Sequence, residues 1–174
     1  MSTGWVWHER YMWHDTGSGA AFLEPVGFLE PGEHVENPES KRRIRNLLEI
    51  SGMLDQLIAI EPREATAEEL GRVHETDYIS RIRDLSAAGG GLAGDEAPFS
   101  RGGYEIAALS AGGCLAAVEA VAAGKVDNAY AMVRPPGHHA MADAGLGFCI
   151  FNNCAVAAAH ARGELGFDRV AIID

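Results

Sequence analysis

The stretch Asn128-Ala-Tyr-Ala-Met-Val-Arg134-Pro-Pro-Gly-His-His-Ala140 decides the fold class of this sequence. Its first six residues, 128–133, form a short apolar run with strand character, which the Pro-Pro-Gly segment ends. An Ala-rich helix is predicted at 152–162, and a second apolar run lies within 169–174 and ends in Asp174. Two apolar strands joined through a helix are typical of a parallel β-α-β unit with a right-handed crossover. The sequence therefore predicts an α/β fold in which both strands point the same way.

The composition fits one soluble domain and excludes several kinds of partner. The chain has 174 residues, of which 47% are hydrophobic and 22% charged, enough to build one ordinary core. A net charge of −11 argues against nucleic-acid binding and favours cationic ligands. Neither a membrane span nor a signal sequence is recognisable, so we expect a cytoplasmic protein without membrane contact. Three irregularly spaced cysteines fit a reducing compartment.

The upstream segments alternate between loops and helices. Residues 1–40, rich in Trp, Gly and Pro, are predicted to be ordered loop that packs on the domain or contacts a second subunit in a homo-oligomer. Residues 86–101, rich in Ala and Gly, are predicted to be a flexible surface loop. The remaining predicted elements are helices at 39–51, 66–85 and 102–124, the second opening on a capping box, and a strand at 56–60.

The tandem histidines are the strongest functional signal. Ligand sites of open α/β sheets form beyond the carboxyl ends of the strands, where His138, His139 and Asp174 would gather. Two imidazoles oriented by a carboxylate are general acid/base groups. Paired histidines also occur by chance in surface loops, and Asp174 alone is typical of a strand-end cap. The Pro-Pro-Gly segment before the pair favours the functional interpretation, because it stiffens the loop more than a solvated pair needs.

Other potential sites are weaker. Cys149 could be a thiol nucleophile, although a Cys between Phe148 and Ile150 is more simply a small buried hydrophobe. The sequence contains no H-E-x-x-H, C-x-x-C or P-loop pattern. The remaining histidines are interpreted as isolated surface or core groups: His8, His14, His34, His74 and His160.

The motif around the tandem histidines resembles a known family. The run Arg134-Pro-Pro-Gly-His-His-Ala140, continued by Gly145-Leu-Gly-Phe-Cys-Ile-Phe-Asn-Asn153, resembles the catalytic core of histone deacetylases and acetylpolyamine amidohydrolases, closest to bacterial class II-like amidohydrolases. Two upstream segments, 34–39 with Arg43 and 73–78, resemble further family motifs. The resemblance implies a three-layer α/β fold with a mostly parallel sheet, arginase/deacetylase-like, of which residues 1–174 would be the N-terminal portion.

The resemblance also implies roles for single residues. His138 is similar to the family's charge-stabilising histidine, and His139 to the general base that later acts as acid. Asp174 is similar to the carboxylate partner of His138, which also binds a structural monovalent cation such as K+. Gly147 and Phe148 resemble the wall of the acyl-lysine tunnel. Asp95 resembles the rim carboxylate that holds the substrate backbone.

The implied activity is zinc-dependent removal of acyl groups from acyl-lysine or acetylpolyamine-type amines. The family's Zn2+ ligands and its oxyanion-stabilising tyrosine follow the position of Asp174, so we expect them beyond residue 174. We also expect these 174 residues alone to be an inactive fragment of a longer enzyme. Two alternatives remain open: a cysteine-dependent hydrolase that pairs Cys149 with His138 or His139, and a non-catalytic binding domain of the same fold.

Overall fold

The computed structural model describes residues 1–19, 23 and 27–174. The strands are β1 (Thr3–Val6), β2 (Ser18–Gly19), β3 (Gly32–Glu33), β4 (Ile58–Ile60), β5 (Gly90–Leu92), β6 (Gly94–Asp95), β7 (Pro98–Ser100), β8 (Asn128–Ala131) and β9 (Gly145–Leu146). The α-helices are α1 (Glu39–Ile50), α2 (Ala67–Leu70), α3 (Thr76–Ala88), α4 (Gly103–Ala122) and α5 (Asn153–Gly163). Short 3-10 helices lie at Glu9–Trp13 and Leu54–Gln56.

The centre of the fold is a parallel three-stranded sheet in the order β4-β1-β8. Trp5 of β1 is paired with Ala59 of β4 on one side and with Tyr130 of β8 on the other. The prediction that residues 1–40 are ordered loop is therefore wrong for Thr3–Val6, which forms the middle strand. Three of its four residues, Gly4, Trp5 and Val6, are buried, so this short strand shows no alternation that would distinguish it from the surrounding Gly and Trp residues.

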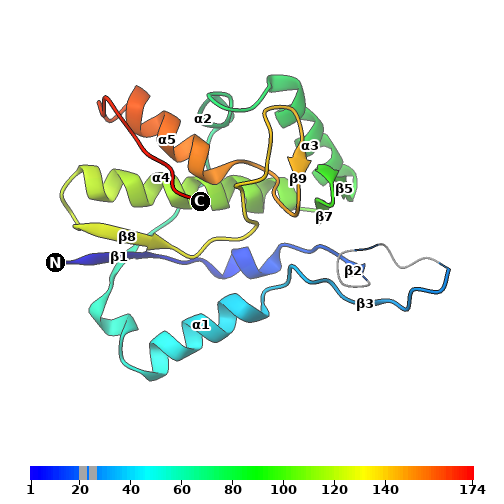
Figure 1. Ribbon diagram of the computed structural model, residues 1–174, viewed down its shortest axis with the longest axis horizontal. Coiled ribbons are helices and arrows are strands. Elements are labelled where there is room, and N and C mark those ends of the chain that lie inside the picture. Colours follow the sequence, from blue (N-terminus) through cyan, green and yellow to red (C-terminus); the bar gives the residue numbers. More distant parts are fainter. Residues whose placement is uncertain (20–22, 24–26) are drawn as a thin grey trace.

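Helices cover both faces of the sheet, which confirms the α/β class. Figure 1 shows α4 along one face of the sheet, α1 on the other face, and α5 beyond α4. Close contact of α4 with its surroundings depends on small residues: a Cβ on Gly112 would lie 1.8 Å from the carbonyl oxygen of Arg63. By length and composition α4 could also cross a membrane, but 67% of its apolar window is buried inside the fold, as in the core helix of a soluble protein.

The helices predicted at 39–51, 102–124 and 152–162 are confirmed with small shifts of their ends, whereas the helix predicted at 66–85 is wrong as a single element: it is two helices, α2 and α3, separated by residues 71–75. Thr66 caps α2 with its side chain, which accepts from the Glu69 backbone N–H, while the Glu69 carboxylate accepts from the Thr66 N–H. This reciprocal capping box is the one that the sequence predicts. Burial of Leu70, Ile82 and Leu115 then fixes α2, α3 and α4 around one apolar core.

The prediction of a flexible loop at 86–101 is wrong. Most of this segment forms the end of α3 and the strands β5, β6 and β7, with β5 and β7 paired antiparallel. Ala93 and Ala97 are fully buried, and Phe99 is 3% exposed. The small residues of this segment permit close packing of the chain rather than motion.

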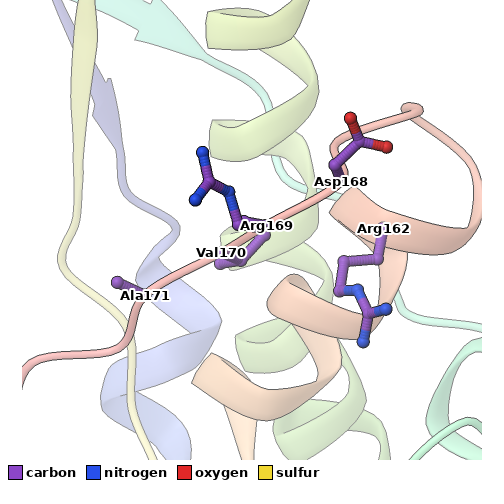
Figure 2. A pocket seen from close by; sticks show the side chains of 5 residues that line it. All are labelled: Arg162, Asp168, Arg169, Val170 and Ala171. Carbon is purple, nitrogen blue, oxygen red and sulfur yellow. The ribbon is translucent and has the colours of Figure 1, made fainter.

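The predicted strand at 169–174 is also wrong. Residues 164–174, all of which the structure describes, form no strand. Val170 and Ile172 pass beside α4 and α5, where they line a pocket with Val118 of α4 and Cys154 of α5. Figure 2 shows residues 168–171 of this segment, which line a second pocket together with Arg162 of α5. Apolar composition gives strand character, but a strand also needs a hydrogen-bonded neighbour. Residues 166–174 are exposed and pair with no strand in the described part of the chain.

Candidate active site

The tandem histidines lie in the loop that follows β8, as predicted. The ring centroids of His138 and His139 are 4.2 Å apart, and the rings are nearly perpendicular at 80°. The start of this loop is fixed to two helices, because the carbonyl of Pro135 accepts hydrogen bonds from Ser110 Oγ of α4 at 2.8 Å and Asn153 Nδ2 of α5 at 3.2 Å. The loop therefore holds the imidazole pair on a rigid support.

The structure brings Asp174 to the tandem pair, although not on a strand. The Nδ1 atom of His138 and the Oδ1 atom of Asp174 are 3.5 Å apart. Both side chains are partly open to solvent, at 46% and 72% exposure. A carboxylate at this nitrogen favours a proton on Nδ1 and leaves Nε2 of His138 free to accept or donate.

The predicted substrate residues Asp95, Gly147 and Phe148 also lie together. Parallel pairing of β6 with β9 places Asp95 opposite Leu146. Two backbone bonds extend this pairing: Gly147 N–H donates to Asp95 O at 3.0 Å, and Phe148 N–H donates to Glu96 O at 2.7 Å. The rim carboxylate and the predicted wall are thus parts of one backbone assembly.

Gly147 connects this wall to the acid/base pair. Its φ is +50°, and a Cβ at this position would lie 2.9 Å from Cδ2 of His139. Only glycine adopts this conformation easily and lets the imidazole approach so closely. On the other side of the wall, the ring of Phe148 meets His34 edge to face, with centroids 5.2 Å apart.

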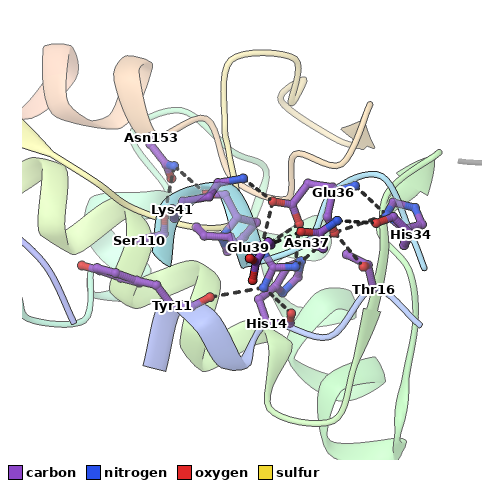
Figure 3. A network of polar contacts seen from close by, with 12 residues as sticks. Tyr11, His14, Thr16, His34, Glu36, Asn37, Glu39, Lys41, Ser110 and Asn153 are labelled. Atoms are coloured by element: carbon purple, nitrogen blue, oxygen red, sulfur yellow. Dashed lines mark hydrogen bonds and ion pairs between the residues drawn. The ribbon is translucent and has the colours of Figure 1, made fainter. Parts of the chain in front are cut away.

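A buried ion pair that the sequence analysis missed supports the same loop. Arg134 is 1% exposed, and its Nε donates to both carboxylate oxygens of Glu36 at 2.8 and 2.9 Å. Its remaining donors reach the carbonyls of Tyr11, His14 and Glu36 (Figure 3). Both residues could have been singled out from the sequence, because Glu36 lies in the segment 34–39 and Arg134 begins the segment 134–140, and both segments carry the family resemblance. What the sequence does not show is that residues 98 positions apart meet.

The charges of this network shift the pKa of two groups. Burial acts to raise the pKa of Glu36, but the hydrogen bonds and charge of Arg134, with Lys41, outweigh it, so the pKa lies below its ordinary value. Burial, followed by the positive charge of Arg134, lowers the pKa of His14 to about 3. His14 is 2% exposed, as expected for a core group, and is a neutral imidazole beside the buried ion pair, although its ring nitrogens have no hydrogen-bond partner among the described residues.

Cys149 lacks the features of a nucleophile. It is fully buried, and burial raises the pKa of its thiol despite the nearby backbone N–H groups of His139 and Ala140. A reactive cysteine needs access and a lowered pKa. The geometry therefore favours the interpretation of Cys149 as a small buried hydrophobe.

The described residues do not form a zinc site at the tandem pair. A catalytic zinc needs three protein ligands, and in the described part of the chain a group of three or more possible ligands forms only at Glu69, Glu119 and His160. Arg63 already occupies the space between these two carboxylates, since its Nη2 lies 2.6 Å from Glu69 Oε1 and 2.7 Å from Glu119 Oε1. The cluster joins α2, α4 and α5 and does not fit a metal ion while the guanidinium is in place.

Comparisons with known proteins identify the family of this chain. The histone deacetylase domain family matches residues 34–174. A histone deacetylase-like amidohydrolase of Pseudomonas aeruginosa is 45% identical over 175 residues, which cover 99% of this chain and 46% of that protein. The polyamine deacetylase HDAC10 of Homo sapiens is 36% identical over 185 residues, which cover 100% of this chain and 25% of that protein.

A solved structure shares the fold as well. The crystal structure of the HDA15 HD domain superposes with a TM-score of 0.80 at 30% identity, over 93% of this chain and 44% of that chain. The chain thus spans less than half the length of these relatives. On the sequence match and the shared fold together, the chain belongs to the histone deacetylase family.

Proposed function

We propose that this chain forms the acid/base part of an amidohydrolase that removes acyl groups from acylated amines. The observation that carries the proposal is the contact between His138 and Asp174 beside His139, within a family whose named relatives are deacetylases. Amide hydrolysis needs a base to take a proton from water and an acid to give one to the leaving amine. Two adjacent imidazoles, one held by a carboxylate, supply these groups.

The two histidines take different parts. We assign to His138, whose Nδ1 lies 3.5 Å from Oδ1 of Asp174, the stabilisation of charge that develops next to the scissile amide. His139 has its Cδ2 edge close to Gly147, where a Cβ would lie 2.9 Å from it. We assign to His139 the removal of the proton from water and its return to the leaving nitrogen.

The substrate class follows from the rim. Asp95 is an exposed carboxylate on the backbone assembly that also carries Phe148, so an acylated amine would pass an apolar wall beside a negative charge. An acyl-lysine peptide and an acetylpolyamine both fit this chemistry, and the human relative is named a polyamine deacetylase. The net charge of −11 favours such cationic substrates.

Zinc dependence, a structural K+ at Asp174 and a cytoplasmic location are parts of the same proposal. The zinc ligands would come from outside these 174 residues. Bound zinc would lower the pKa of water to about 7 and polarise the acyl carbonyl.

Replacement of His139 tests the proposal. In the intact protein, His139→Ala should lower turnover of an acetyl-lysine peptide and of an acetylpolyamine by about 10²- to 10⁴-fold, the contribution of a general base. Elemental analysis should give the same zinc content as in the wild type, and His8→Ala, on another part of the surface, should keep wild-type turnover. Near-normal turnover of His139→Ala would remove the role assigned to this residue.

A further inference from the structure

His74 is buried beneath the tandem-histidine loop. It follows α2, is 3% exposed, and packs with its ring centroid 5.3 Å from that of Phe151 and 5.5 Å from that of Tyr78. The sequence alone gives it no partner and no role. A buried imidazole at this place is costly unless its polar atoms are used.

The ring nitrogen Nε2 of His74 accepts a hydrogen bond from the backbone N–H of Asn152 at 2.9 Å. An acceptor nitrogen carries no proton, so the neutral ring carries its proton on Nδ1. Nδ1 faces the carbonyls of Met141 and Ala142, without a well-aligned hydrogen bond to either. Burial lowers the pKa of His74, in agreement with a neutral ring.

Asn152 links His74 to the tandem-histidine loop. Its Nδ2 donates to the carbonyl of Ala140 at 3.1 Å and approaches that of His138 at 3.4 Å, while its Oδ1 accepts from Ala155 N–H and caps α5. One residue after His74, the Glu75 N–H donates to Ala142 O at 2.9 Å. The loop is therefore hydrogen-bonded on both sides of His139: Asn152, which His74 holds, contacts the carbonyls of His138 and Ala140, and Glu75 contacts that of Ala142.

We infer that His74 is a positioning residue for the tandem histidines, acting through Asn152. The inference rests on the proposed function for its activity readout. The positioning role requires the acceptor atom Nε2 of His74, whereas a purely structural role would require only the buried ring.

Two variants in the intact protein separate these requirements. His74→Phe keeps an aromatic ring but has no acceptor, and His74→Gln keeps an acceptor oxygen without the ring. We expect His74→Phe to lower kcat by ~10- to 100-fold with little change of KM, the scale of a misplaced catalytic group. His74→Gln should recover most of that kcat. Equal loss in both variants, or a loss in Gln alone, would overturn the inference in favour of packing.

Asn152→Asp tests the connecting residue. Aspartate keeps the acceptor that caps α5 but lacks the Nδ2 donor to Ala140, so kcat should fall as in His74→Phe. The double variant should lose little more than either single variant, because both changes break one connection. A matched control is His8→Phe, since His8 Nδ1 also accepts a backbone N–H, from Arg10 at 3.0 Å, away from the loop. It should leave kcat unchanged, and fully additive losses in the double variant would contradict the connection.

Histidine ring NMR signals give a readout that does not depend on turnover. His74→Phe should shift or broaden the ring signals of His138 and His139, and His74→Gln should leave them near their wild-type positions. Unchanged signals in His74→Phe would overturn the positioning role. A wild-type protein that hydrolyses no acylated amine would overturn the proposed function instead, and the ring signals would still decide the role of His74.

Discussion

Removal of the charge on Glu36 should destabilise the protein strongly. In Glu36→Gln the guanidinium of Arg134 stays buried at 1% exposure, while the carboxylate that accepts from its Nε at 2.8 and 2.9 Å is lost. Carbonyls of Tyr11 and His14 still accept from Arg134, but they carry no full charge. Breaking one partner of a buried pair costs about 3–5 kcal/mol.

Equilibrium unfolding in urea, followed by tryptophan fluorescence, measures this loss. With an m value of about 2 kcal/mol/M, the midpoint should fall by about 1.5–2.5 M. The matched control is Glu39→Gln, the same chemical change in the exposed pair with Arg43, at 57% and 78% exposure. It should change the free energy of unfolding by less than about 1 kcal/mol.

The pH dependence gives a second measure of the same pair. Because the pKa of Glu36 is depressed in the fold, its stabilisation is fully present above the ordinary value of 4.5 and is lost as the pH falls through the folded pKa. The difference between wild type and Glu36→Gln should therefore shrink below that pH. If Glu36→Gln does not fold, the apolar pair Glu36→Leu with Arg134→Met should restore folding. A midpoint for Glu36→Gln within the range of the Glu39→Gln control would refute the reasoning.

Three further predictions concern two close contacts of glycines and the reactivity of one buried thiol. Gly112→Ala should lower the free energy of unfolding by about 1–3 kcal/mol in urea titrations, because its Cβ would meet Arg63 O at 1.8 Å; an unchanged midpoint would contradict the close packing. Gly147→Ala should cost about 1–2 kcal/mol at φ +50° and perturb the ring signals of His139, and a variant with wild-type stability and signals would argue against that contact. Cys149, which is fully buried and has a raised pKa, should resist iodoacetamide in the folded protein, as read by mass spectrometry; rapid labelling would reopen the thiol hypothesis.

Most helices, and the place of the tandem histidines in the loop after a strand, could be predicted from the sequence. The capping box at Thr66, the apolar spacing of α4 and the Ala-rich α5 are local patterns, so each helix follows from residues within a few positions of one another. The tandem histidines are fixed in the same way, because the strand before them and the Pro-Pro-Gly segment are contiguous with them.

Other features depend on partners that are distant in the chain, and only the tertiary structure decided them. Thr3–Val6 is the central strand because β4 and β8 pair with it, whereas the apolar segment 169–174 stays exposed and forms no strand. The Arg134–Glu36 pair joins positions 98 apart, and the bond from Asn152 to His74 joins positions 78 apart. Periodicity and capping are properties of a segment, but burial and pairing are properties of the folded chain, so the sequence determined the helices and the folded core determined which strands and polar groups meet.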